Sequence, residues 1–469
     1  MTDARPPPHP WLVPTVTALV ALALRVPLAF VADDQFGDAP VRLEILRRFV
    51  AHPGLYWDFS HVNQYGPLPT QLTGLVALAG VGPLVASRVV VVAGGVLSVA
   101  LVARLAQRFT GSRGALAAGL ALALSPLHLQ ASTTFASETI YLAFALGTIL
   151  AALDDAPLLA IVCAFGASTT RYDAWLWLPV LAGWWAWKEF RGRRARGLAV
   201  AALLLLGPAS ILLANGLSSG HPFAPLTFIA DEHVRLAARA EAQYGRLSWR
   251  VSMLGYWPAA LFGLLTPGFA IALFPGLVRA LKWRSRALLP LSLGLLPPLL
   301  YTGKSVLLGS FWPMARFALG PATLLLAAMP ALRTRTLVVC VMLALATDAA
   351  LVYEGDGSPG LGLAAAASSP LSRLPADLRA GAQALRHFEG PAALDKVPTY
   401  EDIVVSCASR RDRYLLEHVP PNVVPGLVVS LSGGALDGEL RASGEAFGHR
   451  YARTRAIGRV TLWRLAPAP

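Results

Sequence analysis

Long apolar runs separated by short polar segments dominate the first three quarters of the chain. A helix rises about 1.5 Å per residue, so roughly 20 apolar residues cross the hydrocarbon core of a bilayer. On this criterion the sequence predicts about eleven membrane-spanning helices. They cover residues 11–31, 84–106, 115–129, 138–153, 157–170, 174–188, 197–215, 255–281, 287–302, 315–332 and 336–353.

Two apolar runs need separate interpretation. The first, at residues 11–31, follows a proline-rich start and precedes no small-x-small cleavage site, so we expect an uncleaved signal anchor. The run at residues 67–80 is short for a span and contains Pro67 and Pro69, which favours a helix lying at the membrane interface. If this run does not cross the bilayer, the loops with basic clusters all fall on the same side of the membrane.

Basic residues cluster in alternate loops. If the N-terminus lies in the cytoplasm, every cluster falls on the cytoplasmic side, as the positive-inside rule requires. Polar segments 32–66, 216–254 and 354–469 then lie outside the cytoplasm, where we expect the chemistry. The basic clusters are Arg104, Arg108 and Arg113; Lys188, Arg191, Arg193, Arg194 and Arg196; Arg279, Lys282, Arg284 and Arg286; and Arg333 and Arg335.

The composition of the chain changes after residue 353. A glycine- and alanine-rich linker at 354–370 separates the membrane domain, residues 1–353, from a polar tail at 371–469. The tail contains an amphipathic helix pattern and several short apolar runs, which predict a small extracytoplasmic α/β domain. We expect the helix at 378–388 and strands at 392–397, 403–407, 427–432 and 455–465.

The overall composition agrees with this α-helical polytopic membrane architecture. Hydrophobic residues make up 55% of the chain, charged residues 14%, and the mean hydropathy is +0.54, which argues against a soluble protein. The net charge of +13 follows from the basic loops, so we expect no nucleic-acid partner. Cys163 and Cys340 lie in apolar runs and only Cys407 lies in a polar region, which excludes a disulfide framework.

The first outer loop begins with a group of acids, Asp33, Asp34 and Asp38. A carboxylate held beside other carboxylates at a lipid interface tends to have a raised pKa, which suits a general base acting on a hydroxyl. Adjacent acids also suit a divalent cation such as Mg²⁺ or Mn²⁺, and the sequence requires no other cofactor. The alternative is a solvated loop whose acids only mark the outer side.

Further charged residues are expected at the same outer level. Glu138 opens the fourth span, where the helix dipole favours an acid, and Arg171 interrupts two apolar runs next to Asp173. Arg171 could bind an anion or form a structural ion pair with Asp173. Lys304 and Arg316 could hold the phosphate of a lipid-linked substrate or snorkel to headgroups.

Two further groups of charged residues have more than one interpretation. Arg25, late in the first span, has the same two interpretations as Lys304 and Arg316. In the long outer loop, Asp231, Glu232 and His233 are consecutive, and consecutive residues on a helix cannot all face one ion. An acceptor-binding or structural loop is therefore favoured over a metal site there.

The order of these features resembles the GT-C glycosyltransferases, specifically the bacterial polyprenyl-phosphate-sugar-dependent group related to protein O-mannosyltransferases and aminoarabinose transferases. The resemblance covers roughly residues 11–353 and rests on loose motifs. A departure is that Gln35 follows the acidic pair where many relatives have Glu, which leaves the identity of the base open. The matching motifs are Asp33-Asp34, Tyr65-Gly-Pro-Leu68, Ser87-Arg88, Pro126, Glu138 and Arg316-Phe317.

This resemblance implies a fold and a function. It implies a transferase of the bacterial inner membrane that moves a sugar from a polyprenyl-phosphate carrier to a hydroxyl of a glycan, lipid or protein acceptor, with inversion. Asp33 or Asp34 would be the base, and Glu138 would orient the acceptor or help hold a cation. Arg88 and Tyr65 would belong to the substrate site. The alternatives are a lipid-sugar flippase or small-solute transporter, and a membrane scaffold that presents the outer domain.

Overall fold

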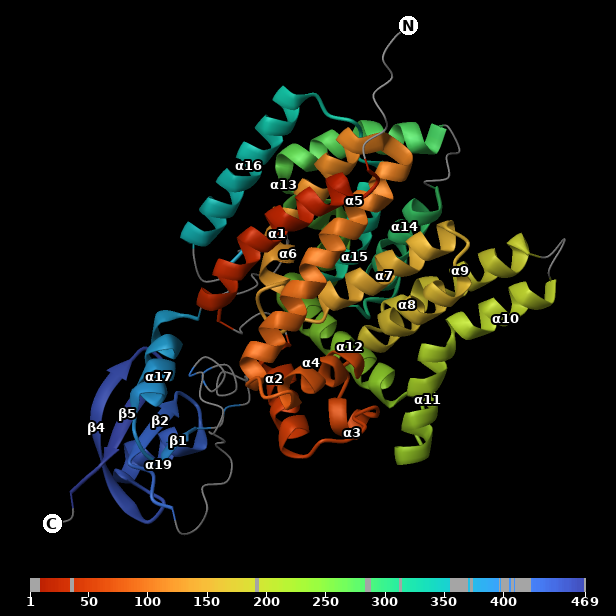
Figure 1. The fold of residues 1–469 in the computed structure, drawn as a ribbon. Coiled ribbons are helices and arrows are strands. Elements are labelled where there is room, and N and C mark those ends of the chain that lie inside the picture. The colour runs from red at the N-terminus through yellow and green to blue at the C-terminus, as the bar shows by residue number, and fades with distance from the viewer. Residues whose placement is uncertain are drawn as a thin grey trace, which may run out of the picture.

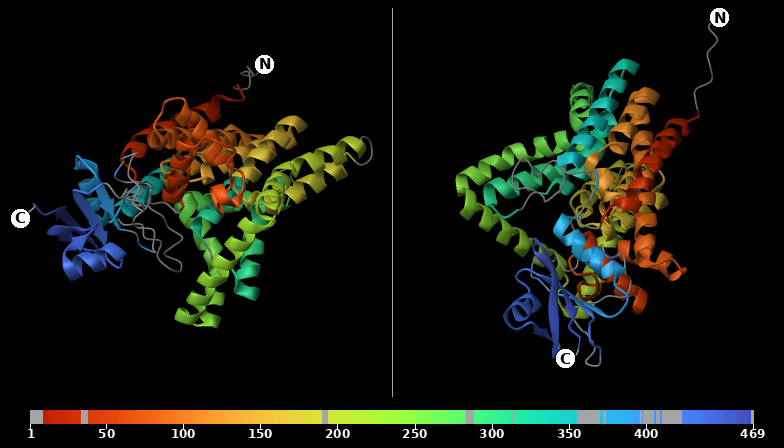
Figure 2. Two further views of the ribbon diagram at one scale, coloured as in Figure 1. Left: turned by 90° about the horizontal axis from the view of Figure 1, so that it is seen from below. Right: turned by 90° about the vertical axis from the view of Figure 1, so that its left-hand side faces the viewer.

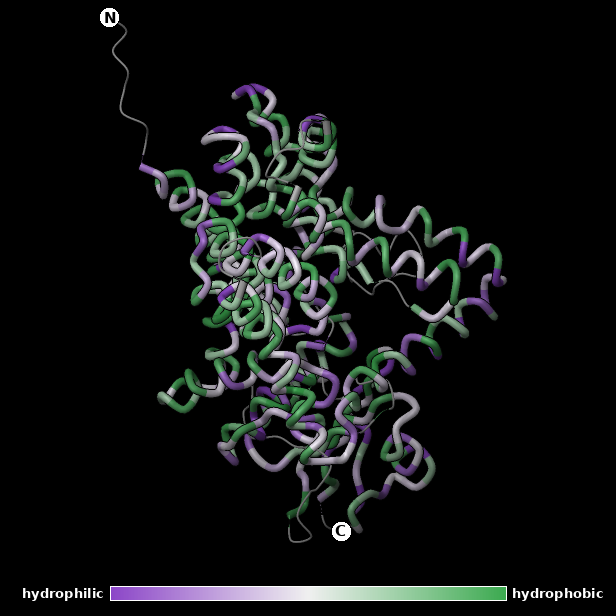
Figure 3. The backbone as a smooth tube through the Cα atoms, turned by 90° about the vertical axis from the view of Figure 1, so that its right-hand side faces the viewer, coloured by the Kyte–Doolittle hydropathy of each residue, from purple (hydrophilic) through white to green (hydrophobic). Residues whose placement is uncertain are grey.

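A computed structural model describes the protein at residues 9–33, 38–189, 194–282, 288–311, 314–354, 370–371, 374–395, 397, 405, 409 and 423–467. Helices dominate the membrane part, and a small sheet lies near the C-terminus (Figure 1). Hydrophobic residues predominate along the helices, and many of the hydrophilic residues lie near helix ends and turns (Figure 3). This distribution suits helices that pack together within lipid.

The helices of the membrane part follow one another with short connections. Several begin with proline at their first position, where a missing N–H costs nothing. The helices are α1 (Leu12–Val31), α2 (Ala39–Ala51), α3 (Phe59–Val62), α4 (Leu68–Leu78), α5 (Pro83–Ala123), α6 (Pro126–Ala131), α7 (Glu138–Leu153), α8 (Pro157–Thr170), α9 (Ala174–Lys188), α10 (Arg194–Leu204), α11 (Leu206–Ser219), α12 (Ala224–Tyr244), α13 (Arg246–Lys282), α14 (Leu288–Gly303), η1 (Lys304–Leu308), α15 (Ala315–Leu325), η2 (Leu326–Ala328) and α16 (Thr334–Glu354).

Within the described residues, 5 helices are long and apolar enough to cross a membrane, or 6 if the bent pair α10 and α11 counts as one span. The long ones are α1, α5, α13, α14 extended into η1, and α16. α7, α8 and the helix at 315–328 are apolar but shorter. The predicted class is confirmed, whereas the number of spans, about eleven by sequence, stays a prediction.

Breaks within helices account for part of this difference. Gly111 has φ 72° and ψ −174°, and it joins two helices that the sequence predicts as separate spans. Thr266 has φ 59° and precedes Pro267, which breaks α13 into two helices. α10 and α11 meet at 51°. The run predicted to lie at the interface forms α4, which at 11 residues is too short to span a bilayer in a straight path.

Small residues let the central helices approach closely. α1 packs along α5, and α5 packs against α7 (Figure 1). At Gly94 of α5 a Cβ atom would lie only 3.1 Å from the backbone nitrogen of Ile140 on α7, so glycine permits this contact. Gly66 allows another close approach, because a Cβ there would overlap the carbonyl oxygen of Thr170 at the end of α8. The first outer loop is therefore packed directly onto the α8–α9 connection.

The C-terminal part is a five-stranded sheet in the order β1-β2-β5-β4-β3, with helices α17 (Ala376–His387) and α19 (Ala435–Ser443). β1 pairs with β2 in parallel, and the other pairs are antiparallel. Apolar residues of α17 pack on one face, and Leu440 of α19 packs with Trp463 on the other. The strands are β1 (Ala392–Leu394), β2 (Leu427–Leu431), β3 (Glu445–Ala446), β4 (His449–Ile457) and β5 (Val460–Leu465).

The predicted elements of this tail are largely present. The strand expected at 455–465 is wrong, because Gly458 and Arg459 form a two-residue turn between β4 and β5, with Gly458 at φ 53°. The strand expected at 403–407 lies outside the described residues except for Val405. The views agree that the sheet lies beside the helical part and near the end of α1 (Figures 1 and 2).

Candidate functional site

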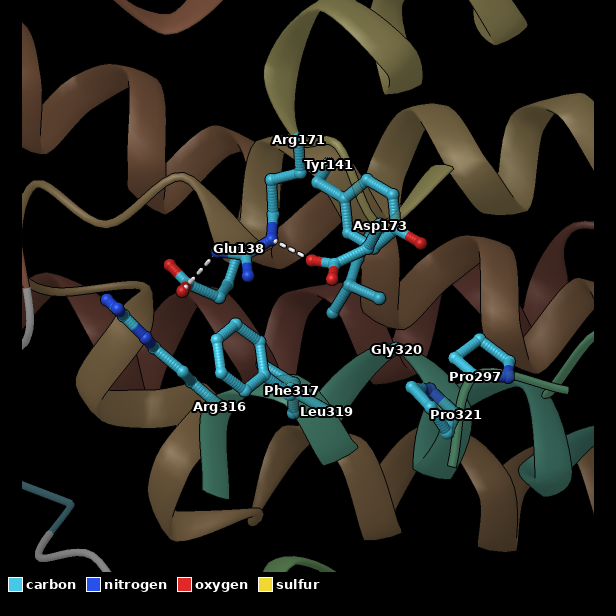
Figure 4. Close-up of a pocket in the computed structure, with 11 residues that line it drawn as sticks. Glu138, Tyr141, Arg171, Asp173, Pro297, Arg316, Phe317, Leu319, Gly320 and Pro321 are labelled. Carbon is cyan, nitrogen blue, oxygen red and sulfur yellow. Dashed lines mark hydrogen bonds and ion pairs between the residues drawn. The ribbon is translucent and has the colours of Figure 1, made fainter. Parts of the chain in front are cut away.

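Segments that are distant in sequence meet at one pocket (Figure 4). Glu138 is the first residue of α7, Arg171 and Asp173 lie in the connection between α8 and α9, and Arg316 is in the first turn of α15. The empty space is about 320 Å³ with its open mouth included. The lining residues are Glu138, Tyr141, Leu142, Arg171, Asp173, Pro297, Arg316, Phe317, Leu319, Gly320 and Pro321.

Arg171 lies between two carboxylates of this pocket. Its Nη1 donates to Oε1 of Glu138 at 2.6 Å, and its Nε donates to Oδ2 of Asp173 at 2.6 Å (Figure 4). The Tyr301 hydroxyl donates to Oδ1 of Asp173 at 2.6 Å. The predicted Arg171–Asp173 ion pair is present, and Glu138 is a second partner. Oε2 of Glu138 accepts no hydrogen bond from the described residues, so it can accept one from a substrate.

Arg316 connects the pocket to the first outer loop. Its Nη1 donates to Oδ2 of Asp38 at 2.7 Å, and its Nε is buried with no acceptor among the described residues. The ring of Phe317 lies near both pocket guanidiniums, with its centroid 5.5 Å from Arg316 and 5.8 Å from Arg171. Phe317 thereby gives each of these two cations a favourable aromatic face.

Three arginines decide the electrostatics of Asp38. Burial alone would raise the pKa of this carboxyl, but Arg316, Arg42 and Arg171 outweigh burial and hold that pKa below its ordinary value. The raised pKa expected for an acid of this loop is therefore wrong for Asp38, because the charges of three arginines outweigh the effect of burial. Asp38 is ionised at neutral pH.

Tyr65 lies next to this charged group. The Arg42 guanidinium stacks 4.3 Å from the centroid of the Tyr65 ring, and both side chains are buried. Burial, together with the charge of Asp38, raises the pKa of Tyr65, so its hydroxyl stays protonated and can donate a hydrogen bond. The sequence does not single out Arg42 as a site residue, because Arg42 follows Asp38 by four positions in an ordinary amphipathic helix.

The other acids of the first loop are placed differently. The Asp33 carboxylate accepts a hydrogen bond from the backbone N–H of Leu374 at 3.0 Å, which ties the end of α1 to the start of the C-terminal domain. Asp33 does not line the pocket. Asp34 lies outside the described residues. Of the described acids in this loop, Asp38 is thus the one that pairs with a pocket residue.

The predicted cations are not all at the pocket. Arg25 is wholly buried among helices, which does not support contact with lipid phosphate or headgroups. Arg88 donates to the carbonyl of Ala32 at 3.0 Å and lies outside the pocket lining. Lys304 begins η1 and is half-buried, close enough to His233 of α12 to influence its charge.

His233 and an aromatic cluster border the site. The His233 ring lies 4.7 Å from Phe311 and 5.8 Å from Phe317, and Tyr301 stacks on Phe311 at 4.4 Å. Burial, then Lys304 and Arg316, lower the pKa of His233 to about 4, so the ring is neutral at neutral pH. Sequence reasoning missed Tyr301 as a site residue and named Phe317 only within the motif Arg316-Phe317, because single aromatic residues in apolar runs resemble ordinary core residues.

The side chains of this site give little support for a bound metal ion. Within the described ranges, no three side chains of His, Cys, Asp or Glu come together. Glu138 and Asp173 are already paired with Arg171, whose positive charge disfavours a cation beside it. We therefore derive no chemical step through a metal.

The sequence matches no protein-family model and no curated protein. The structure is similar to the crystal structure of ArnT from Cupriavidus metallidurans bound to undecaprenyl phosphate, with a TM-score of 0.61 and 15% identity over 96% of this chain and 97% of that chain. The chain has the fold of this ArnT. The apo crystal structure of the same ArnT gives a TM-score of 0.60 with the same identity and coverage.

The resemblance to aminoarabinose transferases expected from sequence is thus confirmed as a likeness of fold, and the chain is an integral membrane protein. The oligosaccharyltransferase of Archaeoglobus fulgidus, tethered with an acceptor peptide, is also similar, with a TM-score of 0.48 and 14% identity over 85% of this chain and 63% of that chain. At these identities the similarity concerns the fold rather than the substrate.

Proposed function

We propose that this protein is a membrane glycosyltransferase that moves a sugar from a polyprenyl-phosphate carrier to a hydroxyl of an extracytoplasmic acceptor, with inversion at the anomeric carbon. The observation that carries the proposal is the convergence of Glu138, Arg171, Asp173 and Arg316 on one pocket, to which Asp38 is joined through Arg316. Carboxylates and arginines therefore border the same pocket. Transfer of a sugar away from a phosphate leaving group requires both kinds of group.

Arg316 is the proposed phosphate ligand. Its buried Nε has no acceptor among the described residues, and a phosphate oxygen would supply one. Lys304 adds a second positive charge near His233. The ArnT with the same fold was crystallised with undecaprenyl phosphate, which supports a carrier of this chemical class.

Asp38 is the proposed general base. It takes the proton from the acceptor hydroxyl, the hydroxyl oxygen forms the new bond to the anomeric carbon, and the bond between that carbon and the phosphate oxygen breaks. Polyprenyl phosphate leaves as an anion, so no proton donor is needed for it. The free Oε2 of Glu138 orients the acceptor by accepting a hydrogen bond from another hydroxyl.

Donor binding would itself activate the base. In the structure Arg316 is the ion-pair partner of Asp38 and holds its pKa low, which makes it a weak base. A phosphate that draws Arg316 away removes this partner, so the pKa of Asp38 rises toward the range that suits proton transfer. Base strength and donor occupancy are thereby linked.

The proposed orientation puts the N-terminus and basic loops in the cytoplasm of a bacterial inner membrane. Arg108 pairs with Asp154 and Lys188 pairs with Asp155, so the basic residues before the break in α5 and at the end of α9 meet the end of α7 that is opposite Glu138. The pocket then lies at the extracytoplasmic end. Residues 371–469 form the outer domain in this arrangement.

A transfer assay tests the proposal. Purified protein in lipid nanodiscs is incubated with radiolabelled polyprenyl-phosphate sugars and an extract of cell-envelope glycans and lipids. We expect protein-dependent release of polyprenyl phosphate and transfer of label to an acceptor with inverted configuration. The same donors in sealed vesicles provide the second arm, where movement of intact donor across the bilayer without cleavage would identify a flippase and overturn the proposal.

A further inference from the structure

Arg25 of α1 is a fully buried cation that the proposed reaction does not use. Its Nε donates to Oγ of Ser132 at 3.0 Å, and its Nη2 lies 2.6 Å from Nδ1 of His128. Its Nη1 donates to the carbonyls of Ala21 at 3.0 Å and Ala123 at 3.3 Å. One side chain therefore connects α1 with the end of α5, with α6 and with the segment that follows α6.

The charge of Arg25 is balanced without an ion pair to any described carboxylate. Ala123 is the last residue of α5, where helix carbonyls carry partial negative charge. His128 is itself wholly buried, and its Nε2 lies 2.9 Å from Oγ of Ser98. Burying an arginine inside a membrane protein is costly, so such residues usually have a specific role.

The surrounding helix is shaped to admit this network. At Gly95 of α5 a Cβ atom would lie 2.6 Å from Oγ of Ser132, which is too close for a real side chain, and 3.1 Å from Nε of Arg25, which is a tight contact. Ser98 lies one turn further along α5 and reaches His128. The absence of a side chain at Gly95 thus leaves space for the guanidinium and its partners.

Both segments joined by Arg25 lead to the pocket. The chain leaves α1 and reaches Asp38, the proposed base, through the first outer loop. From Ser132 the chain runs through a short connection to Glu138, the first residue of α7. The hydroxyl of Ser132 also donates to the carbonyl of His128, so the bond from Arg25 fixes the residue where this connection begins.

We infer that Arg25 is a positioning residue, which fixes the connection before Glu138 relative to α1 and so aligns Glu138 with Asp38. This inference rests on the proposed function for its catalytic consequence, whereas the positioning itself is independent of activity. Misplacing a reacting group by about 1 Å can cost on the order of 100-fold in rate. Arg25 would therefore act through geometry, without touching the substrate.

Two variants separate positioning from stability. Arg25→Met leaves His128 buried with an unsatisfied ring nitrogen, so it should lower the thermal unfolding midpoint. The double variant Arg25→Met/His128→Leu removes both polar groups and should recover much of that loss, because an apolar pair of similar shape is tolerated in a core. Thr17→Val, at a buried position of α1 that bonds only within its own helix, is the matched control.

Kinetics provide the first readout. In the double variant we expect kcat to stay about 10- to 100-fold below the unmodified protein, with KM for the polyprenyl-phosphate sugar changed less than about threefold. Arg25→Lys, which cannot reach all partners at once, should give an intermediate kcat. Recovery of kcat together with stability in the double variant would show a purely structural role and would overturn the inference.

Hydrogen exchange provides a readout that does not need activity. Backbone amides of residues 132–139 should lose protection in the double variant, whereas amides of α9 should not change. Unchanged protection at 132–139 would overturn the inference even if transfer is confirmed. Lost protection in a protein without transfer activity would support positioning and count only against the proposed function.

Discussion

The guanidinium of Arg316 donates to the carboxylate of Asp38 at 2.7 Å, although 278 residues separate them in sequence. This contact joins the first turn of α15 to the residue that precedes α2. The side chains are 15% and 27% exposed, so solvent at the pocket mouth only partly screens the pair. A ligand that competes for Arg316 therefore changes the charge environment of Asp38 directly.

Asp38→Asn should lower the rate of sugar transfer by about 10²- to 10⁴-fold, the range for loss of a positioned general base. The amide keeps the size of the side chain but cannot accept the proton. The matched variant Asp33→Asn should retain activity within about threefold, because its amide oxygen can still accept from the N–H of Leu374. Both rates are measured by release of polyprenyl phosphate under saturating donor.

Asp34→Asn completes this series. If Asp34→Asn abolishes transfer while Asp38→Asn leaves it intact, the base is Asp34 and the role given to Asp38 is wrong. Thermal unfolding midpoints of all three variants establish that each protein is folded. A loss of activity in all three without loss of folding would instead point to the charge of the loop as a whole.

Arg316→Ala should weaken donor binding by about 10- to 150-fold, which corresponds to the 1.5–3 kcal/mol of a hydrogen bond to a charged group. Arg316→Lys keeps the charge but not the forked geometry, so it should recover only part of the affinity. Binding is measured as the dissociation constant for polyprenyl phosphate. Arg250→Ala is the control, because Arg250 forms a similar ion pair with Glu241 but does not line the pocket.

Unchanged affinity in Arg316→Ala would remove the phosphate role from this residue. Equal losses in Arg316→Ala and Arg250→Ala would indicate a general effect of outer-loop charge rather than a specific contact. Raising the salt concentration distinguishes these two outcomes further. A loss of affinity that comes from general outer-loop charge should shrink at high salt, whereas a loss at a specific buried contact should persist, since exposed charges are screened more strongly than buried ones.

Several features of this site could be predicted from the sequence because they are local. Glu138 at the start of α7 and the pair Arg171–Asp173 lie at interruptions of apolar runs, where a charge is conspicuous. α7 and α8 have the predicted bounds because proline or a polar residue marks each start. The length of an apolar run and the position of the prolines that bound it can be read directly from the sequence.

Other features depend on tertiary contacts and could not be predicted. Nothing in the apolar pattern shows that Arg25 faces His128 inside the bundle or that Asp33 reaches Leu374. The Asp38–Arg316 pair joins two residues that are 278 positions apart in the sequence. The hairpin between β4 and β5 was missed because its arginines and apolar residues continue the strand pattern through Gly458.

Arg171→Met should destabilise the protein by about 3–5 kcal/mol, because it leaves the buried Glu138 and the half-buried Asp173 together without a cation. The side chains of Arg171 and Glu138 are only 10% and 5% exposed, so water cannot replace the lost partner. The measurement is the thermal unfolding midpoint in nanodiscs. Glu138→Gln alone should cost less, because Arg171 retains Asp173.

The double variant Arg171→Met/Glu138→Gln tests the coupling between these two residues. Its destabilisation should be smaller than the sum of the two single effects, since removing Glu138 relieves the repulsion that Arg171→Met creates. Additive effects would mean that Glu138 and Arg171 do not interact energetically, despite their 2.6 Å contact.

Asp377 of α17 should make the stability of the C-terminal domain depend on pH. Hydrogen bonds from the side chain and backbone of Arg459 hold the pKa of Asp377 at about 2, below its ordinary value of 3.8. Because the folded pKa is the lower one, the stabilisation is fully present above about pH 4 and is lost as the pH falls toward 2. Solvent screens this pair, so we expect about 0.5–1 kcal/mol.

Amide hydrogen exchange tests this pH dependence. Protection of α17 and β5 is measured in the full-length protein at pH 5.5, 4 and 3 and is corrected for intrinsic exchange rates. Protection should fall between pH 4 and 3, and Arg459→Met should flatten that dependence because Asp377 then titrates near its ordinary pKa in both states. Arg453→Met is the control, since Arg453 is exposed on β4 and forms no ion pair with a described residue. An unchanged pH profile in Arg459→Met would mean that another carboxylate, rather than Asp377, controls the acid stability of this domain.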